Sequence, residues 1–234
     1  MTQVLQKTGT KLELLNAAER LFATKGFDAT TVKEITEASG QRNQSVIHYH
    51  FGSREAILDA LIELRVSPIN EARNRLRAEM LAQSCGQALT TQQICRLLVN
   101  PPLDRILNDS GPHYASRLSL QLRVNRDLWR KYELARSAWT LDEVHAELVR
   151  ARPYLPKEIV RSRFRNIVLL SMVAIAELEQ VQERMGPKFD EEEARFRIEE
   201  MVSSMCGIID APISPTALDY LGKASAQDEG QSTN

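Results

Sequence analysis

The sequence has few of the features that mark metal sites, secretion or membrane insertion. It contains three cysteines, Cys85, Cys95 and Cys206, and none of them forms a CxxC pair or a Cys/His metal spacing. The N-terminus lacks the apolar run of a signal peptide, and the longest uncharged apolar stretch is about half of the ~20 residues that cross a bilayer. We therefore expect buried thiols in a cytoplasmic protein, with no metal, no cofactor and no membrane contact.

Excess positive charge, which often marks nucleic-acid-binding proteins, is also missing. The chain carries 30 Lys and Arg against 31 Asp and Glu, for a net charge of -1. Its first 55 residues contain seven basic and six acidic side chains. DNA binding, if present, must therefore come from the local placement of donors rather than from a large positive field.

The residue patterns of the common catalytic sites are absent as well. No Ser/His/Asp, Cys/His, HExxH or Gly-rich phosphate-loop arrangement is found. His48 and His50 would point apart on a helix, and His113 and His145 have no carboxylate at a spacing that would indicate a catalytic pair. The acidic run at 190–193 fits a solvated helix start. We expect that the protein is not an enzyme.

Strand signals are nearly absent, whereas helical periodicity covers most of the chain and is broken by glycine and proline. The expected fold is all-α, with about nine helices. The domains expected are a DNA-binding unit at 1–55, a regulatory and dimerisation unit at 56–211, and a largely disordered C-terminal segment at 212–234. Pro68 should kink the fourth helix near Ser67, and Pro101-Pro102 should end the fifth. The helices are expected over residues 10–25, 31–40, 43–49, 53–81, 91–99, 112–125, 126–151, 156–185 and 190–209.

Residues 31–51 have the pattern of a helix-turn-helix. Thr31 and Glu34 form a capping box at the start of one helix, and Gly40 ends it. A short polar turn and a second short helix follow, with polar side chains on one face. Because a recognition helix reads bases mainly with its N-terminal residues, Asn43, Gln44 and Ser45 are the candidates. The Gln44 amide could make the paired hydrogen bonds that select adenine.

Three segments carry a resemblance to a known family. LLNAAERLFATKGF (14–27), DATTVKEITEASG (28–40) and SVIHYHFGSREA (45–56) resemble the first helix, the second helix and the recognition helix of the TetR family. The similarity is nearly continuous over residues 12–58, about a fifth of the chain. The turn from Gly40 to Asn43 is one residue longer than the commonest form in the family.

The resemblance implies a three-helix DNA-binding domain followed by a helical ligand-binding and dimerisation domain. It implies a homodimeric transcriptional regulator, most often a repressor, that a small-molecule effector releases from a palindromic operator on double-stranded DNA. One alternative is a helical regulator controlled by a protein partner. The other is an all-helical enzyme or carrier.

Positions that match the family motif supply the expected contacts with DNA. Gln44 and Ser45 would read bases, and His50 would pack at the end of the recognition helix. The Val46 backbone would lie near a phosphate, as would several side chains around it. The predicted DNA-binding set is Thr31, Lys33, Arg42, Asn43, Gln44, Ser45, His48, Tyr49 and Arg54.

Aromatic residues in the middle of the chain are candidates for an effector pocket, because such pockets are mostly apolar with a few polar groups. Packing in the core or at an interface is the alternative for each of them. The candidate ligand-binding residues are Tyr114, Arg117, Trp129, Tyr132 and Trp139.

The expected helix at 156–185 is apolar on more than one face, so a second copy of the chain could bury the excess surface. The final helix would share that interface. The candidate dimer residues are Phe164, Val168, Ser171, Ile175, Leu178, Met201 and Met205.

Overall fold

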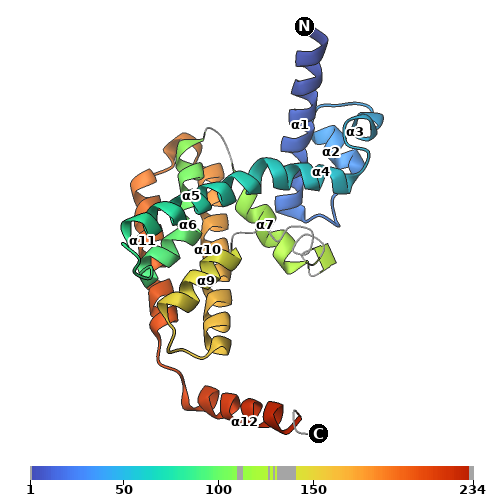
Figure 1. Cartoon of the computed structure of the whole chain (residues 1–234). Helices are drawn as coiled ribbons and strands as arrows, with labels where there is room; N and C mark the ends of the chain where they lie inside the picture. The colour runs from blue at the N-terminus through green and yellow to red at the C-terminus, as the bar shows by residue number, and fades with distance from the viewer. Residues whose placement is uncertain (1, 110–112, 126, 129, 131–140, 232–234) are drawn as a thin grey trace.

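The structure, a computed structural model, describes residues 2–109, 113–125, 127–128, 130 and 141–231. The regular elements within these ranges are all helical, which confirms the all-α class. Figure 1 shows two groups of helices joined by the run from α4 to α5, with α7 lying where the groups meet. The elements are α1 (Thr2–Lys25), α2 (Val32–Ala38), α3 (Ser45–His50), α4 (Arg54–Leu61), η1 (Ile62–Val66), α5 (Ser67–Gln83), α6 (Thr91–Asn108), α7 (Ala115–Val124), α9 (Leu141–Ala151), α10 (Lys157–Met185), η2 (Gly186–Lys188), α11 (Glu191–Asp210) and α12 (Pro215–Gln231).

The first helices pack around one apolar stripe. Leu14, Ala18 and Phe22 recur at every fourth position of α1 and are fully buried. Ile35 of α2 and Ile47 of α3 close the core from the other side and are also fully buried. Burial of each large side chain contributes about 1.5–3 kcal/mol, so this small unit has a hydrophobic core.

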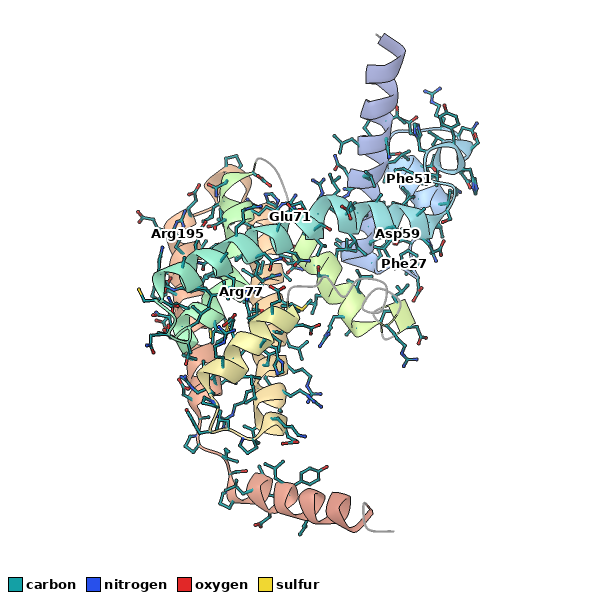
Figure 2. The ribbon with its side chains drawn as sticks, viewed as in Figure 1. Phe27, Phe51, Asp59, Glu71, Arg77 and Arg195 are labelled. Carbon is teal, nitrogen blue, oxygen red and sulfur yellow. The ribbon has the colours of Figure 1, made fainter. Side chains whose placement is uncertain are left out.

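That core extends beyond the first three helices. It includes Ile57 and Leu61 of α4, and it also includes Leu118 and Leu122 of α7. The domain boundary expected at residue 55 therefore does not coincide with an edge of the core. A second core joins α6, α9, α10 and α11. In Figure 2, the labelled Phe27 and Phe51 lie in the first group of helices, and Arg77 and Arg195 lie in the second.

The expected break near Ser67 is present. The α-helical geometry of α4 gives way to the π-helical turn η1 before α5 begins at Ser67. Pro68 lies in the first turn of α5, where its missing N–H is tolerated. The wide turn therefore marks the point where the chain leaves the first core and enters the second.

The prediction that Pro101-Pro102 ends a helix is wrong, because α6 continues through both prolines to Asn108. In a regular helix the N–H of residue 101 would bond to the Leu97 carbonyl, and proline has no N–H. The Nε of Arg73 donates to that carbonyl instead, at 2.9 Å. A side chain from α5 thus satisfies the carbonyl that the proline leaves free, and the helix is not forced to stop.

Two other expectations also differ from the structure. The C-terminal segment was expected to be largely disordered, but residues 215–231 form α12, which lies apart from the other helices in Figure 1. Pro215 at its first position and the N–H of Ala217 donating to Ser214 Oγ help to start this helix. Cys85 is exposed rather than buried, because it lies with a positive φ in the turn after α5. No helix in the described ranges is long and apolar enough to cross a membrane.

Candidate nucleic-acid interface

The start of α2 has the capping box that the sequence predicts. The Glu34 N–H donates to Thr31 Oγ1 at 3.2 Å, and the Thr31 N–H donates to Glu34 Oε2 at 2.8 Å. Lys25 Nζ donates to the same carboxylate at 2.7 Å. The Lys25 ammonium, followed by the Thr31 donors, lowers the pKa of Glu34 to about 2. These contacts fix α2 against the end of α1, and they engage the Thr31 side chain that was expected near a phosphate.

The turn between α2 and α3 depends on Gly40, which has a φ of +74°. This left-handed conformation suits glycine, and a side chain there would be strained. The Gly40 and Gln41 N–H groups donate to carbonyls of the last turn of α2, at 3.1 and 3.0 Å. The Gln41 side chain donates to Glu13 Oε2 at 3.2 Å, which ties the turn to α1. The direction of α3 is therefore set by backbone geometry.

The outward face of α3 is polar at its N-terminal end. The opposite side of this helix is held in the core by Ile47. Asn43 does not extend freely from this face, because its Oδ1 accepts the Ser45 N–H at 2.9 Å. Gln44 and Ser45 are exposed, and Tyr49 is exposed over 67% of its surface. The two residues predicted to read bases are therefore accessible to a duplex.

Two more of the predicted residues make local contacts. His48 Nδ1 donates to the Gly52 carbonyl at 2.9 Å, which leaves Nε2 as an acceptor in the neutral ring. Arg54 is half-buried, and its guanidinium donates to the carbonyl of Thr30 at 2.6 Å and to that of Phe27 at 3.1 Å. It also lies over the Phe27 ring, 4.2 Å from the ring centre. Arg54 thus joins the start of α4 to the α1–α2 loop.

One basic residue near α3 was not in the predicted set. The exposed Lys11 places its Nζ 5.5 Å from the centre of the Phe51 ring, directly after α3. Nothing in the local sequence marks this proximity, since the two residues lie on different elements. Lys33 and Arg42, which were predicted, are both exposed. Lys33 makes a long 3.8 Å ion pair with Glu37.

The candidate effector residues divide into two groups. Trp129, Tyr132 and Trp139 lie outside the described residues. Tyr114 and Arg117 are both buried, and both donate to Glu183 on α10, at 2.5 and 2.6 Å. They lie where α7 meets α10, and Arg117 lines neither of the two cavities described next.

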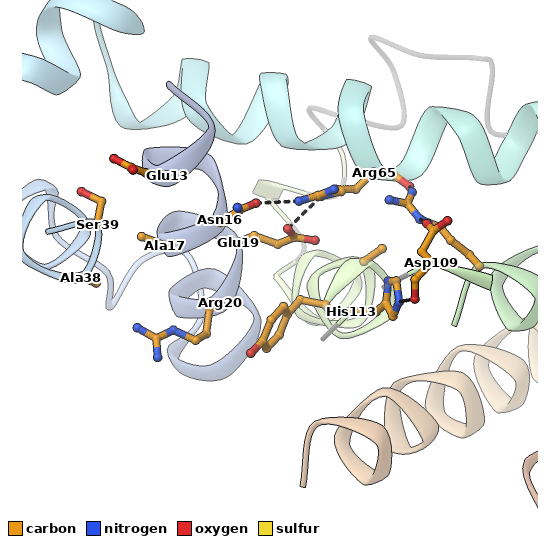
Figure 3. Close-up of a pocket in the computed structure, with 13 residues that line it drawn as sticks. Glu13, Asn16, Ala17, Glu19, Arg20, Ala38, Ser39, Arg65, Asp109 and His113 are labelled. Carbon is orange, nitrogen blue, oxygen red and sulfur yellow. Dashed lines mark hydrogen bonds and ion pairs between the residues drawn. The ribbon is translucent and has the colours of Figure 1, made fainter. Parts of the chain in front are cut away.

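A polar cleft with a cavity volume of about 570 Å³ lies between the two cores (Figure 3). Arg65 of η1 reaches across it, donating to Glu19 Oε2 at 2.9 Å and to Asn16 Oδ1 at 2.7 Å. Burial raises the pKa of Glu19, although Arg65 opposes the shift. Arg105 of α6 donates to the Arg65 carbonyl at 2.6 Å. Side chains of α1 and α6 thus hold the helical turn η1, which joins the two cores.

A smaller, mostly apolar cavity of about 70 Å³ lies on the other side of η1, toward α10. Its walls come from η1, α5, α6, α7 and α10, together with Leu141 at the start of α9. Ser116 and Ser119 of α7 and Ile175 of α10 line it, and the buried Arg73 lines it from α5. In the described part of the chain, no cluster of three or more His, Cys, Asp or Glu could hold a metal ion.

Most of the candidate dimer residues are turned inward. Phe164 and Met201 are half-buried, and the other five have at most 4% of their surface exposed. These five side chains therefore have almost no surface with which to contact a second protomer. The spacing indicated an apolar helix but not which of its faces the rest of the chain covers. The large apolar side chains that α10 and α11 do expose are Leu169, Val173, Met185 and Phe196. The five buried candidates are Val168, Ser171, Ile175, Leu178 and Met205.

The helices α2 and α3, joined by the turn at Gly40, form a helix-turn-helix whose second helix has an exposed polar face. Residues 14–61 match the family model "Bacterial regulatory proteins, tetR family". The N-terminal helices of the chain therefore match this family, as their sequence indicated.

Curated relatives match over the same region. The HTH-type transcriptional repressor KstR2 of Rhodococcus jostii is 43% identical over 56 residues, which cover 24% of this chain and 27% of the relative. The HTH-type transcriptional repressor AcnR of Corynebacterium glutamicum is 37% identical over 54 residues, 23% of this chain and 28% of the relative. The matched part of the chain thus spans little more than a quarter of these relatives.

Solved structures match over more of the chain. The crystal structure of AmtR from Mycobacterium smegmatis has a TM-score of 0.49 at 22% identity, over 82% of this chain and 84% of that one. Salmonella enterica GusR has a TM-score of 0.45 at 16% identity, over 86% and 96% of the two chains.

Proposed function

We propose that this protein is a sequence-specific DNA-binding transcription regulator that acts as a homodimer and represses its genes until a small-molecule effector releases it. The observation that carries the proposal is the face of α3 that presents Gln44 and Ser45 to solvent. The same helix is held from behind by the fully buried Ile47. A short helix fixed in this way can enter the major groove without rearrangement.

Within this interface the proposed roles follow from exposure. Gln44 reads a base edge, and its amide suits the paired acceptor and donor of adenine. Lys33, Arg42 and Tyr49 are exposed and suited to phosphate contacts, which hold the register without reading sequence. Thr31, Asn43, His48 and Arg54 shape the motif through their local contacts.

A homodimer would place two copies of α3 in successive major grooves, about 34–36 Å apart. For the contact between protomers we propose the exposed faces of α10 and α11. Leu169 and Val173 lie one turn apart on α10, and Phe196 of α11 is 65% exposed. A contiguous exposed apolar patch marks a contact surface, and these side chains would contribute to one.

For the effector site we propose the small apolar cavity next to α7. Its volume of about 70 Å³ is well below the ~300 Å³ or more of typical ligand pockets. A larger occupant must therefore move the walls, and two of these walls are α7 and α10. A ligand can shift the regulator only by binding one arrangement of the walls better than the other. Raised thermal stability in the presence of a metabolite would support this site over control by a protein partner.

DNA binding is tested by fluorescence anisotropy with the DNA upstream of the protein's own gene and with a random duplex of equal length. Wild type should bind the upstream DNA about 10³-fold more tightly or better. Gln44→Ala should lose about 10- to 100-fold on this DNA, because each paired base contact discriminates by about 1–3 kcal/mol. Its binding to the random duplex should be unchanged.

The matched control is Gln92→Ala, which removes an exposed glutamine from α6 in the regulatory region. This variant should bind both duplexes as wild type does. The proposal is wrong if wild type shows no preference between the duplexes. The role of Gln44 is wrong if Gln44→Ala retains the full preference.

A further inference from the structure

The helix α7 belongs to both parts of the molecule. Leu118 and Leu122 of α7 are buried in the core that includes α1 and α4. Its N-terminal residues Ser116 and Arg117 are buried toward α10. Figure 1 shows α7 between the DNA-binding helices and α10. The helix α7 therefore connects α10 with the core that contains α1.

The N-terminus of α7 is capped by a distant residue. Tyr114, at the N-cap position, makes no capping hydrogen bond with its side chain. The carboxylate of Glu179 on α10 takes this role: Oε1 accepts the Ser116 N–H at 2.8 Å, and Oε2 accepts the Arg117 N–H at 3.0 Å. Glu179 is only 2% exposed. One buried carboxylate thus satisfies two of the N–H groups that a helix start leaves unpaired.

A second carboxylate, one turn further along α10, strengthens this junction. Glu183 accepts the Tyr114 hydroxyl at 2.5 Å and the Arg117 guanidinium at 2.6 Å. The Arg117 guanidinium also lies over the Tyr114 ring, 4.4 Å from its centre. Burial raises the pKa of Glu179 to about 7, although the Ser116 and Arg117 donors oppose the shift. Because the donors to Glu179 belong to α7, these hydrogen bonds depend on the position of α7 on α10.

We propose that Glu179 is a positioning residue for DNA binding, which fixes α7 on α10 and through α7 fixes the angle of the helix-turn-helix relative to the regulatory core. The inference rests on the proposed function. It also gives the effector a route of action, because Ser116 and Ile175, which flank Glu179, line the small apolar cavity. An occupant that parts α7 from α10 there would break the contacts of Glu179.

The test compares Glu179→Gln with wild type on two DNA targets, the full operator and a duplex that carries one half-site. Glutamine has nearly the same size, but it offers only one acceptor oxygen and places an N–H₂ group against the other backbone donor. A looser angle matters only when both recognition helices must fit grooves at a fixed separation. We expect about a tenfold loss on the full operator and less than a twofold change on the half-site.

Hydrogen exchange supplies a readout that needs no DNA. In Glu179→Gln the amides of Ser116 and Arg117 should exchange at least tenfold faster, and amides of α1 that face α7 should also accelerate. Amides at the contact of α6 with α11 should be unchanged. Glu177→Gln, an exposed neighbour on α10, is the matched control and should behave as wild type throughout.

The two proposals fail in different ways. If wild type binds no DNA selectively, the proposed function is wrong, while exchange in α7 and α1 still decides whether Glu179 holds the two parts together. Equal losses on operator and half-site, undiminished operator binding, or unchanged exchange at Ser116 and Arg117 would each overturn the role of Glu179. If Glu179→Gln does not fold, Glu179→Asp keeps the charge but shortens the reach, and the same results are expected of it.

Discussion

At the N-termini of both α2 and α7, a carboxylate accepts backbone N–H groups that the helix leaves unpaired, once at the surface and once in the interior. At α2 the carboxylate of Glu34 accepts a backbone N–H within its own turn, on the surface. At α7 the carboxylate of Glu179 accepts two backbone N–H groups from another helix, in the interior. The pKa of Glu34 falls to about 2, with Lys25 as the largest cause, and the pKa of Glu179 rises to about 7 because of burial.

The difference shows that hydrogen bonds alone do not decide the charge of a capping carboxylate. Glu179 has more backbone donors than Glu34, yet its pKa moves the other way, since loss of hydration outweighs the donors. The exposed cap at Glu34 stabilises one short helix. The buried cap at Glu179 connects α10 with α7, so its hydrogen bonds depend on the positions of both helices.

The largest effect is expected from Leu118→Ala, which tests whether α7 belongs to the DNA-binding core. Leu118 is fully buried between α7 and the first helices. Truncation removes apolar burial and leaves a cavity, so the free energy of unfolding should fall by about 3 kcal/mol. Urea unfolding followed by circular dichroism measures the change. Val124→Ala, on the same helix but 72% exposed, should change stability by less than about 0.5 kcal/mol. If the two variants are equally stable, α7 does not contribute to that core.

A second effect of similar size is expected from the pH dependence of the buried cap. Because the pKa of Glu179 is higher in the folded chain than its ordinary value of 4.5, the folded state binds the proton more tightly. This contribution to stability is complete below about pH 4.5 and is lost as the pH rises through about 7. Relative to Glu179→Gln, wild type should lose ~3 kcal/mol of unfolding free energy between pH 4.5 and 8.5.

The measurement is urea unfolding of both proteins at pH 4.5, 6, 7 and 8.5, with stability differences taken at each pH. Other titrating groups affect wild type and variant alike, so the difference isolates Glu179. Glu177→Gln should show no pH-dependent difference from wild type. A wild-type curve parallel to that of Glu179→Gln would show that the Glu179 carboxyl keeps its ordinary pKa.

The same contrast explains how much could be predicted from the sequence. The all-α class, the capping box at Thr31 and the glycine that ends α2 depend on neighbours within four residues, and all three are present. The continuation of α6 through Pro101 was missed because the compensating donor, Arg73, comes from another helix. The cap of α7 was missed for the same reason, since nothing near Ser116 indicates Glu179.

The candidate site follows the same rule. The exposure of Gln44 and Ser45 follows from the helical period, which places Ile47 inward and these two outward. The internal contact of Arg54 with the carbonyl of Thr30 depends on how α4 meets the α1–α2 loop. The inward direction of the candidate dimer residues depends on which faces of α10 the other helices cover. Periodicity gives the faces of a helix, but not the partner that each face receives.

The smallest effect is expected from Thr31→Ala at the exposed cap. The change removes the Oγ1 that accepts the Glu34 N–H, and loss of such a cap costs about 1 kcal/mol. Thr24→Ala is the matched control, because the Thr24 hydroxyl donates to the Arg20 and Leu21 carbonyls within α1 and alanine favours a helix. In thermal unfolding Thr24→Ala should be neutral or slightly stabilising. The loss at Thr31 stays small because the N–H of residue 31 still donates to Glu34, whose carboxylate also keeps its contact with Lys25. A loss as large as that of Leu118→Ala would mean that this cap, too, supports more than its own helix.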